Sequence, residues 1–166
     1  MPELRRQTAL AHRTRGASIR AGDTTLREPI GLRAILVTSR TQICLPGAIH
    51  LGPGEWLMVG DDEEARAALA AAAGTALLQD MSAGLAVIEA EGPDVLDAIG
   101  LSSLTAGIGG ALTTRLADLR VTVEYRRGGR HWARFIVDRF SADYLWAWLV
   151  ARLDAARVDR QPPEAG

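Results

Sequence analysis

The run Leu51-Gly52-Pro53-Gly54-Glu55-Trp56-Leu57-Met58-Val59 begins as a turn and continues as a strand. Glycine and proline favour the turn, and the apolar residues after it favour an extended chain. Asp61 follows almost at once and is suited to cap a helix, with glutamates in the first turn where negative charge is favourable. The segment therefore predicts a strand over 55–59 that leads into a helix ending near Ala73.

The same order of elements recurs near the C-terminus. Trp132–Val137 has the composition of a strand, and Ser141 is placed to cap a helix that runs to about Ala155. The repetition predicts duplicated β-α-β units. We therefore expect an α+β fold with mixed or antiparallel sheets and helices packed on one face.

Further segments fill in this plan. The runs expected to be strands are 32–38, 76–80, 85–89, 114–118 and 121–126. Gly92-Pro93-Asp94 is expected to open a helix that ends at Gly100, because proline suits the first helical position. The glycine-rich residues 107–110 predict a loop, and residues 127–130 predict the turn of a hairpin.

The ends of the chain differ from the middle. Residues 1–24 are polar, rich in arginine and without a clear period, which predicts an arm that is flexible or wraps a partner. Residues 25–156 are expected to form a single α+β domain, and residues 157–166 a disordered tail.

Composition excludes several classes of protein. A net charge of -1 gives no reason to expect nucleic acid or a membrane surface as partner. No stretch approaches the roughly 20 apolar residues that span a bilayer, and no apolar run follows the N-terminal arginines. We therefore expect a cytoplasmic protein. Its single cysteine, Cys44, lies in an apolar run and is expected to be buried and structural.

The residues that could carry chemistry do not form a site. His12, His50 and His131 lack the spacing of metal ligands, and the glycines of 107–110 lack the spacing of a phosphate-binding loop. The chain has no lysine and no serine-centred nucleophile elbow. The sequence thus predicts no catalytic residue, no cofactor site and no metal site in this chain.

The C-terminal helix suggests a contact with another protein. Tyr144, Leu145, Trp148 and Leu149 share one face, while Trp146 and Val150 lie on roughly the opposite side. A helix that is apolar on two faces packs either inside its own domain or between subunits. The candidate interface residues are Trp146, Val150, Arg139 and Trp56; for Trp146 a core position is the alternative.

Taken together, several runs resemble the gamma subunits of heterotetrameric sarcosine oxidases. The resemblance extends from about Thr24 to Asp154, and its most specific parts are the Gly-Pro-x-Glu-Trp run at 52–56 and the aromatic helix. The other runs that carry it are Thr25-Leu26-Arg27-Glu28, Gly92-Pro93-Asp94, Thr113-Thr114-Arg115-Leu116-Ala117-Asp118 and Phe140-Ser141-Ala142-Asp143.

The resemblance implies a fold similar to the folate-binding domain of aminomethyltransferases. It implies a bacterial enzyme complex that oxidatively demethylates sarcosine with FAD, FMN, NAD and tetrahydrofolate, all held by partner subunits. The alpha subunit would be the main contact of this chain, with beta and delta subunits in the same complex. This chain would itself be non-catalytic.

Two alternatives remain open at this point. Family members commonly place Gly-Cys-Pro-Leu-Asp where this chain has Gly100-Leu101-Ser102-Ser103-Leu104, so the complex could act on N-methylglutamate or a betaine-derived amine instead. A different class is a free-standing folate-binding protein of the aminomethyltransferase-like group. Such proteins carry a Lys-Gly-Cys motif, which this chain lacks.

Overall fold

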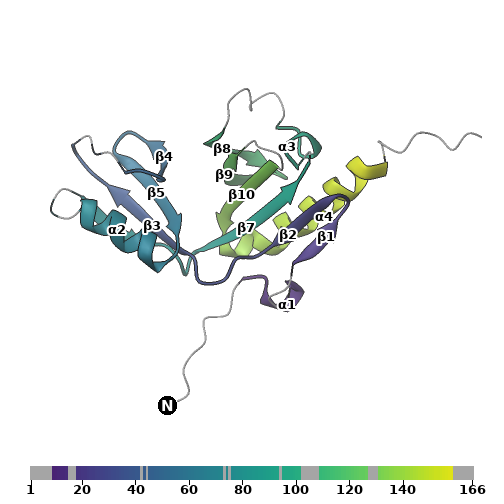
Figure 1. Cartoon of the computed structure of the whole chain (residues 1–166), viewed down its shortest axis with the longest axis horizontal. Helices are drawn as coiled ribbons and strands as arrows, with labels where there is room; N and C mark the ends of the chain where they lie inside the picture. Colours follow the sequence, from purple (N-terminus) through teal and green to yellow (C-terminus); the bar gives the residue numbers. More distant parts are fainter. Residues whose placement is uncertain are drawn as a thin grey trace, which may run out of the picture.

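The computed structural model describes residues 9–14, 18–41, 43, 45–72, 74, 76–93, 95–101, 109–126 and 131–158. Their strands form two antiparallel sheets (Figure 1). The six-stranded sheet has the order β1 (Ile19–Ala21), β2 (Thr24–Arg27), β7 (Leu85–Gly92), β10 (His131–Asp138), β9 (Leu119–Arg126) and β8 (Gly109–Leu116). The four-stranded sheet has the order β4 (Ile49–Gly52), β5 (Glu55–Gly60), β3 (Arg33–Thr38) and β6 (Leu77–Asp80). The helices are α1 (Ala11–Thr14), α2 (Asp62–Ala72), α3 (Val95–Ala98) and α4 (Ala142–Val158), with a 3-10 turn, η2 (Arg139–Ser141), before α4. The expected α+β class with antiparallel sheets is confirmed.

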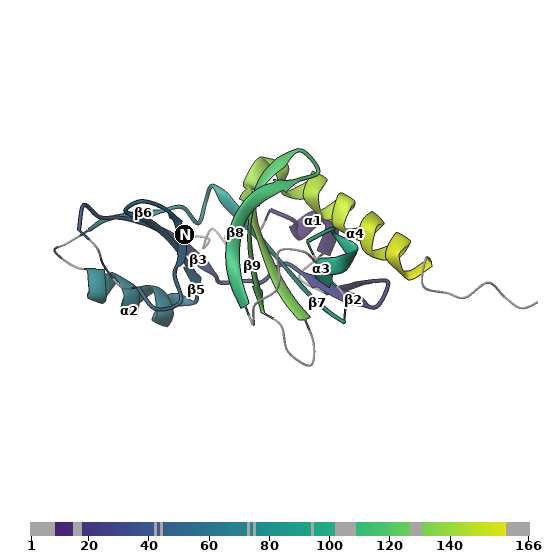
Figure 2. The same cartoon turned by 90° about the horizontal axis from the view of Figure 1, so that it is seen from above.

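Apolar side chains on alternate sides of each strand build a layered core. In β10, Phe135 points into a large cluster shared with α4, whereas Ile136 joins a second cluster with Leu57 and Val59 of the other sheet. Met58 lies between these two residues of β5 and belongs to a third cluster beside α2. Helix, sheet, sheet and helix thus follow one another, with α2 at one end and α4 at the other (Figure 2).

Helix α4 buries one continuous stripe. Its buried apolar residues are Ala142, Leu145, Trp146, Leu149 and Leu153. They recur at the three- and four-residue spacing of a helix face. Tyr144 is 57% exposed, so the expectation that it shares a core face with Leu145 is wrong. The buried stripe includes Trp146 in place of Tyr144.

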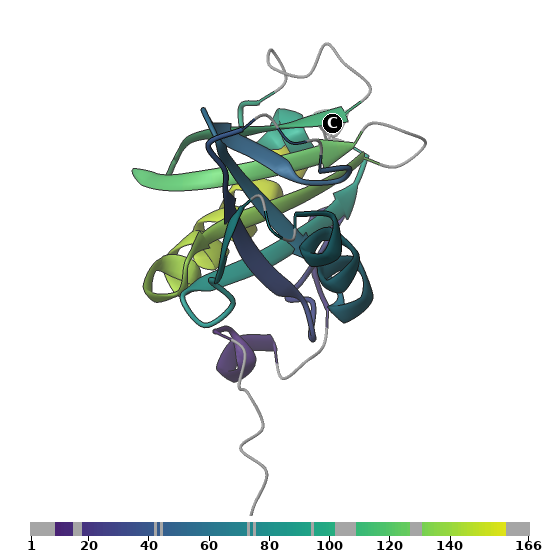
Figure 3. The ribbon, with the colours of Figure 1, turned by 90° about the vertical axis from the view of Figure 1, so that its left-hand side faces the viewer.

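Two connections carry the chain between the sheets. Residues 28–32 join β2 to β3, and residues 81–84 join β6 to β7. The backbone of the second connection is held on both sides, because Met81 N donates to Ala34 O at 2.8 Å and Arg139 N donates to Gly84 O at 2.9 Å. Strands β6 and β7, on either side of this connection, lie in different sheets. The strands of the two sheets cross one another (Figure 3).

The two expected passages from strand to helix, β5 to α2 and β10 to α4, are both present. They differ in which strand takes the third place of the unit. Strand β3 lies between β5 and β6, so β5, α2 and β6 form a split β-α-β unit. Strand β10 leads into α4, and the corresponding place beside β7 is taken by β2 from the N-terminal part of the chain. Two consecutive β-α-β units are therefore not found among the described residues.

The folded unit begins earlier than residue 25. Leu10 is fully buried, and its N–H donates to both carboxylate oxygens of Glu28, at 3.1 and 3.0 Å. Arg13 and His12 bind the carboxylate of Asp143 on α4. Residues 9–14 and 18–24, expected to be part of an arm over 1–24, thus pack against the rest of this chain through the buried Leu10 and the pairing of β1 with β2. Residues 1–8, 15–17 and 159–166 lie outside the described residues.

Two local expectations are corrected. Gly109 and Gly110 belong to β8 rather than to a loop, because they pair with Arg126 and Tyr125 of β9. Ser141 does not open α4; Asp138 caps the preceding turn and accepts a hydrogen bond from Phe140 N at 2.8 Å. Cys44 and residues 107–108 and 127–130 lie outside the described residues.

Candidate functional site

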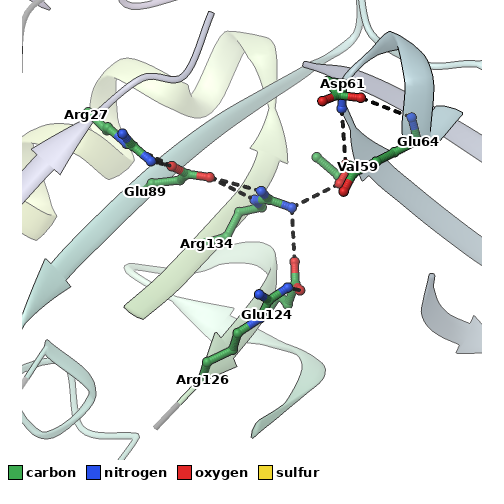
Figure 4. Close-up of polar contacts among 8 residues, drawn as sticks. All are labelled: Arg27, Val59, Asp61, Glu64, Glu89, Glu124, Arg126 and Arg134. Carbon is green, nitrogen blue, oxygen red and sulfur yellow. Dashed lines mark hydrogen bonds and ion pairs between the residues drawn. The ribbon is translucent and has the colours of Figure 1, made fainter. Parts of the chain in front are cut away.

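A row of charged side chains lies on the face of the six-stranded sheet that looks toward the other sheet. We call Arg27, Glu89, Arg134, Glu124 and Arg126 the arginine–glutamate chain (Figure 4). Strand register creates it, because Glu89 is the direct partner of both Arg27 and Arg134, and Glu124 is the direct partner of Arg134. Opposite charges placed across neighbouring strands stabilise the sheet.

The centre of this chain is closely bonded. Arg134 donates from Nε and Nη2 to Glu89 Oε1, at 3.2 and 3.0 Å, and from Nη1 to Glu124 Oε2 at 3.1 Å. Arg27 holds the other oxygen of Glu89, with 2.6 Å between Nη2 and Oε2. The Glu89 side chain is 6% exposed and that of Arg134 is 14% exposed, so their charges are stabilised mainly by one another.

Arg134 also reaches across to the four-stranded sheet. Its Nη1 donates to the carbonyl oxygen of Val59 at 3.0 Å (Figure 4). Val59 lies near the end of β5, two residues before the cap of α2. One guanidinium thus connects three strands of one sheet to the second sheet.

The start of α2 forms the opposite side of this region. Asp61 Oδ1 accepts hydrogen bonds from the N–H groups of Glu63 and Glu64, each at 3.0 Å. Asp61 N donates to Glu64 Oε2 at 3.3 Å, and Figure 4 shows the contacts between Asp61 and Glu64. This reciprocal arrangement is a capping box. The expectation that Asp61 caps this helix is confirmed.

An aromatic ring lies beside two of these arginines. The guanidinium carbons of Arg126 and Arg134 lie 5.0 and 4.9 Å from the centre of the Trp132 ring. Both distances are within the range of cation–π attraction. Trp132 therefore orients Arg126, whose side chain is 73% exposed.

A cavity of about 420 Å³ opens between the two sheets beside this row. Its volume falls in the range of small-molecule sites. The apolar wall comes from the four-stranded sheet, α2 and the turn before β4, and consists of Leu45, Pro46, Gly47, Met58, Val59 and Ala67. The charged wall consists of Glu64, Glu124, Arg126 and Arg134.

The residues expected at a partner interface are not brought together. Trp146 is 3% exposed and lies in the large core cluster, which is the alternative position stated for it. Val150 is half-buried against the same cluster. Arg139 is half-buried and lines a separate groove of about 700 Å³, and Trp56 lies on the other sheet, with its ring centre 5.8 Å from that of His50.

Sequence reasoning missed the exposed apolar residues near the start of α4. Phe140 is 94% exposed and Tyr144 is 57% exposed. Ile30, 72% exposed, lines the groove that also contains Arg139. The spacing of Phe140 and Tyr144, one helical turn apart, was a usable signal for a shared exposed face.

The described residues contain neither a metal-type cluster of side chains nor a helix suited to span a membrane. No three His, Cys, Asp or Glu side chains among them gather in a way that could hold a metal ion. Within the same residues, no helix has both the length and the apolar character needed to cross a membrane.

The fold is an α+β arrangement of two antiparallel sheets between helices, and known proteins share it. No protein-family model matches the sequence, and no curated protein sequence matches it. Among solved structures it is similar to a chain of the heterotetrameric sarcosine oxidase from Corynebacterium sp. U-96, in complex with pyrrole 2-carboxylate. The TM-score is 0.72 at 19% identity, and the match covers 92% of this chain and 96% of that chain. At this identity the likeness establishes the shared fold.

Proposed function

We propose that this chain is a gamma-type, non-catalytic structural subunit of a heteromeric flavin-dependent complex related to sarcosine oxidase. The observation that carries the proposal is the near-complete mutual coverage, 92% and 96%, with one chain of a heterotetrameric sarcosine oxidase. A domain embedded in a larger chain would cover only part of it. The two chains instead match nearly end to end.

The proposal includes partners and chemistry that lie outside this chain. An alpha subunit is the main contact, with beta and delta subunits in the same assembly. FAD, FMN, NAD and tetrahydrofolate belong to those partners, and the assembly removes an N-methyl group oxidatively. Its substrate is sarcosine or a related N-methyl amine such as N-methylglutamate.

Exposed apolar side chains support a role in assembly. Phe140 and Tyr144 present aromatic surface at the start of α4, and Ile30 borders the groove lined by Arg139. Aromatic and arginine residues are enriched where proteins bind one another. Arg139 therefore remains a proposed interface residue, with Phe140 as the aromatic contact beside it in sequence.

Affinity purification of the tagged chain from its native host tests this proposal. We expect a large flavoprotein to co-purify and to give the visible absorption of flavin. Phe140→Asp should reduce the yield of that partner by about tenfold or more, since an interface anchor contributes at least ~2 kcal/mol. Leu77→Asp is a matched control, because Leu77 is 71% exposed on the edge strand β6 of the other sheet. Purification of a stable monomer without a flavoprotein would contradict the proposal.

A free-standing folate-binding protein is the second candidate. The observation that favours it is the inter-sheet cavity, whose volume of about 420 Å³ suits a small molecule. Titration of the purified monomer with tetrahydrofolate separates the two candidates. Micromolar binding by a monomer that captures no flavoprotein would support this second function.

A further inference from the structure

The two walls of the inter-sheet cavity differ in chemistry. Met58, Val59 and Ala67 give one side an apolar surface, whereas Glu124 and Arg126 give the other side charge. Sites for small molecules combine apolar lining with a few polar groups that fix orientation. The cavity therefore suits a ligand with an apolar body and one polar end.

The exposure of the charged lining residues indicates the sign of that end. Two arginines and two glutamates line the cavity, so the lining carries no net charge. Glu64 accepts a hydrogen bond from Asp61 N within the capping box of α2. The Arg126 side chain is 73% exposed, compared with 16% for Glu124 and 14% for Arg134, so Arg126 is the arginine open to a ligand and it favours an anion.

Arg126 is the cation best placed to receive the anion. Arg134 uses Nε, Nη1 and Nη2 in bonds to Glu89, Glu124 and Val59. Arg126 lies at one end of the arginine–glutamate chain and makes a long contact of 3.4 Å from Nη2 to Glu124 Oε1. Stacking on Trp132 holds its planar group beside the cavity, and a planar guanidinium can bind a carboxylate with two parallel hydrogen bonds.

We propose that the inter-sheet cavity binds a small carboxylate with an apolar body. Its carboxylate accepts hydrogen bonds from Arg126, and its apolar body lies against Met58, Val59 and Ala67. The site is built from both sheets, so it depends on the bond that Arg134 makes to Val59. The proposal does not require the chain to be a subunit of any enzyme.

The test uses matched probes that differ in charge. Benzoate and hexanoate are titrated against the full chain, alone or within the complex with which it co-purifies, and compared with benzylamine and hexylamine. Binding is measured by calorimetry and by ligand-observed NMR. We expect both carboxylates to bind and both amines to bind about tenfold more weakly or not at all. Equal or tighter binding of the amines, or no binding of either carboxylate, would overturn the proposal.

Variants locate the site. Arg126→Gln should weaken carboxylate binding by about tenfold, which corresponds to ~1.4 kcal/mol. Arg120→Gln removes the same charge on the same face of β9 but at roughly 20 Å along the strand, so it should leave the affinity unchanged. Equal losses in these two variants would mean that the anion responds to the overall charge and would refute the site.

A third variant tests the apolar wall. Ala67→Phe places a ring in the cavity from exposed helix α2 and should abolish binding of hexanoate while the fold is retained. Retained affinity in this variant would refute the assigned position of the apolar body. Arg126→Gln should co-purify with the same partners as the wild type, so the outcome here is separate from that of the assembly experiment.

Discussion

The guanidinium of Arg134 donates a hydrogen bond of 3.0 Å to the carbonyl oxygen of Val59 and so joins the two sheets. The same side chain holds Glu89 and Glu124, whose carboxylates lie on the strands either side of β10. Because these groups are largely buried, each depends on Arg134 for the stabilisation of its charge.

Arg134→Met should therefore lower the free energy of unfolding by about 3–5 kcal/mol, because it leaves the buried carboxylate of Glu89 with only Arg27. Urea unfolding measures the change. Arg27→Met is the control and should cost about 1 kcal/mol or less, since the Arg27 side chain is 60% exposed and Glu89 keeps Arg134. Similar losses in the two variants would show that Arg134 has no special role at the junction.

Trp146→Ala should destabilise the chain by about 3–5 kcal/mol, because a 3% exposed aromatic side chain leaves a large cavity when truncated. Phe140→Ala, at a 94% exposed position six residues earlier in the sequence, should change stability by less than about 0.5 kcal/mol. Thermal unfolding of the two variants compares them. A small loss of stability for Trp146→Ala would contradict the buried position of that side chain.

Gly54→Ala should lower stability more than Gly47→Ala. Both glycines have positive φ, 74° and 77°, so alanine costs about 1–2 kcal/mol at either position. At Gly54 the added methyl group would also collide with the backbone oxygen of Ser39, whereas at Gly47 no atom lies within 4 Å. Equal midpoints of denaturant unfolding would show that β3 and the β4–β5 turn can separate without cost.

The contact between α1 and α4 should respond to acid. The hydrogen bond from Arg13 lowers the pKa of Asp143 to about 2. A lowered pKa stabilises the folded state above the unfolded pKa of about 3.9, and this stabilisation is lost as pH falls toward 2. Unfolding midpoints measured from pH 5 to pH 2 should fall less steeply for Asp143→Asn than for the wild type. Asp118→Asn, which removes a 98% exposed carboxylate, should keep the wild-type slope.

Local patterns predicted the elements that are determined locally. The β5 strand, the Asp61 cap and the strands β9 and β10 follow from short-range composition and turn residues. The face of α4 did not, because Tyr144, Leu145, Trp146 and Trp148 are all apolar or aromatic and no stripe stands out from them. Packing against the six-stranded sheet selects Trp146 for the core.

The candidate site depends on long-range pairing. Arg27 and Glu89 are 62 positions apart, and Glu89 and Arg134 are 45 apart. Their proximity is set by the register between distant strands, which a one-residue shift would destroy. Charged residues inside otherwise apolar strands, such as Glu89 in Ala86-Val87-Ile88-Glu89-Ala90, were the available sequence signal.

The position of β2 beside β7 allows a different order of the elements along the sequence. The turn after β1 touches the end part of α4, since Gly22 N donates to Asp154 Oδ1 at 2.7 Å. The turn of the β1–β2 hairpin therefore lies against the C-terminal helix. A circularly permuted gene that encodes this hairpin after α4, with a short linker, should specify the same arrangement of strands. Relatives with that permuted order would have this architecture, but their sequences would not align with this one from end to end.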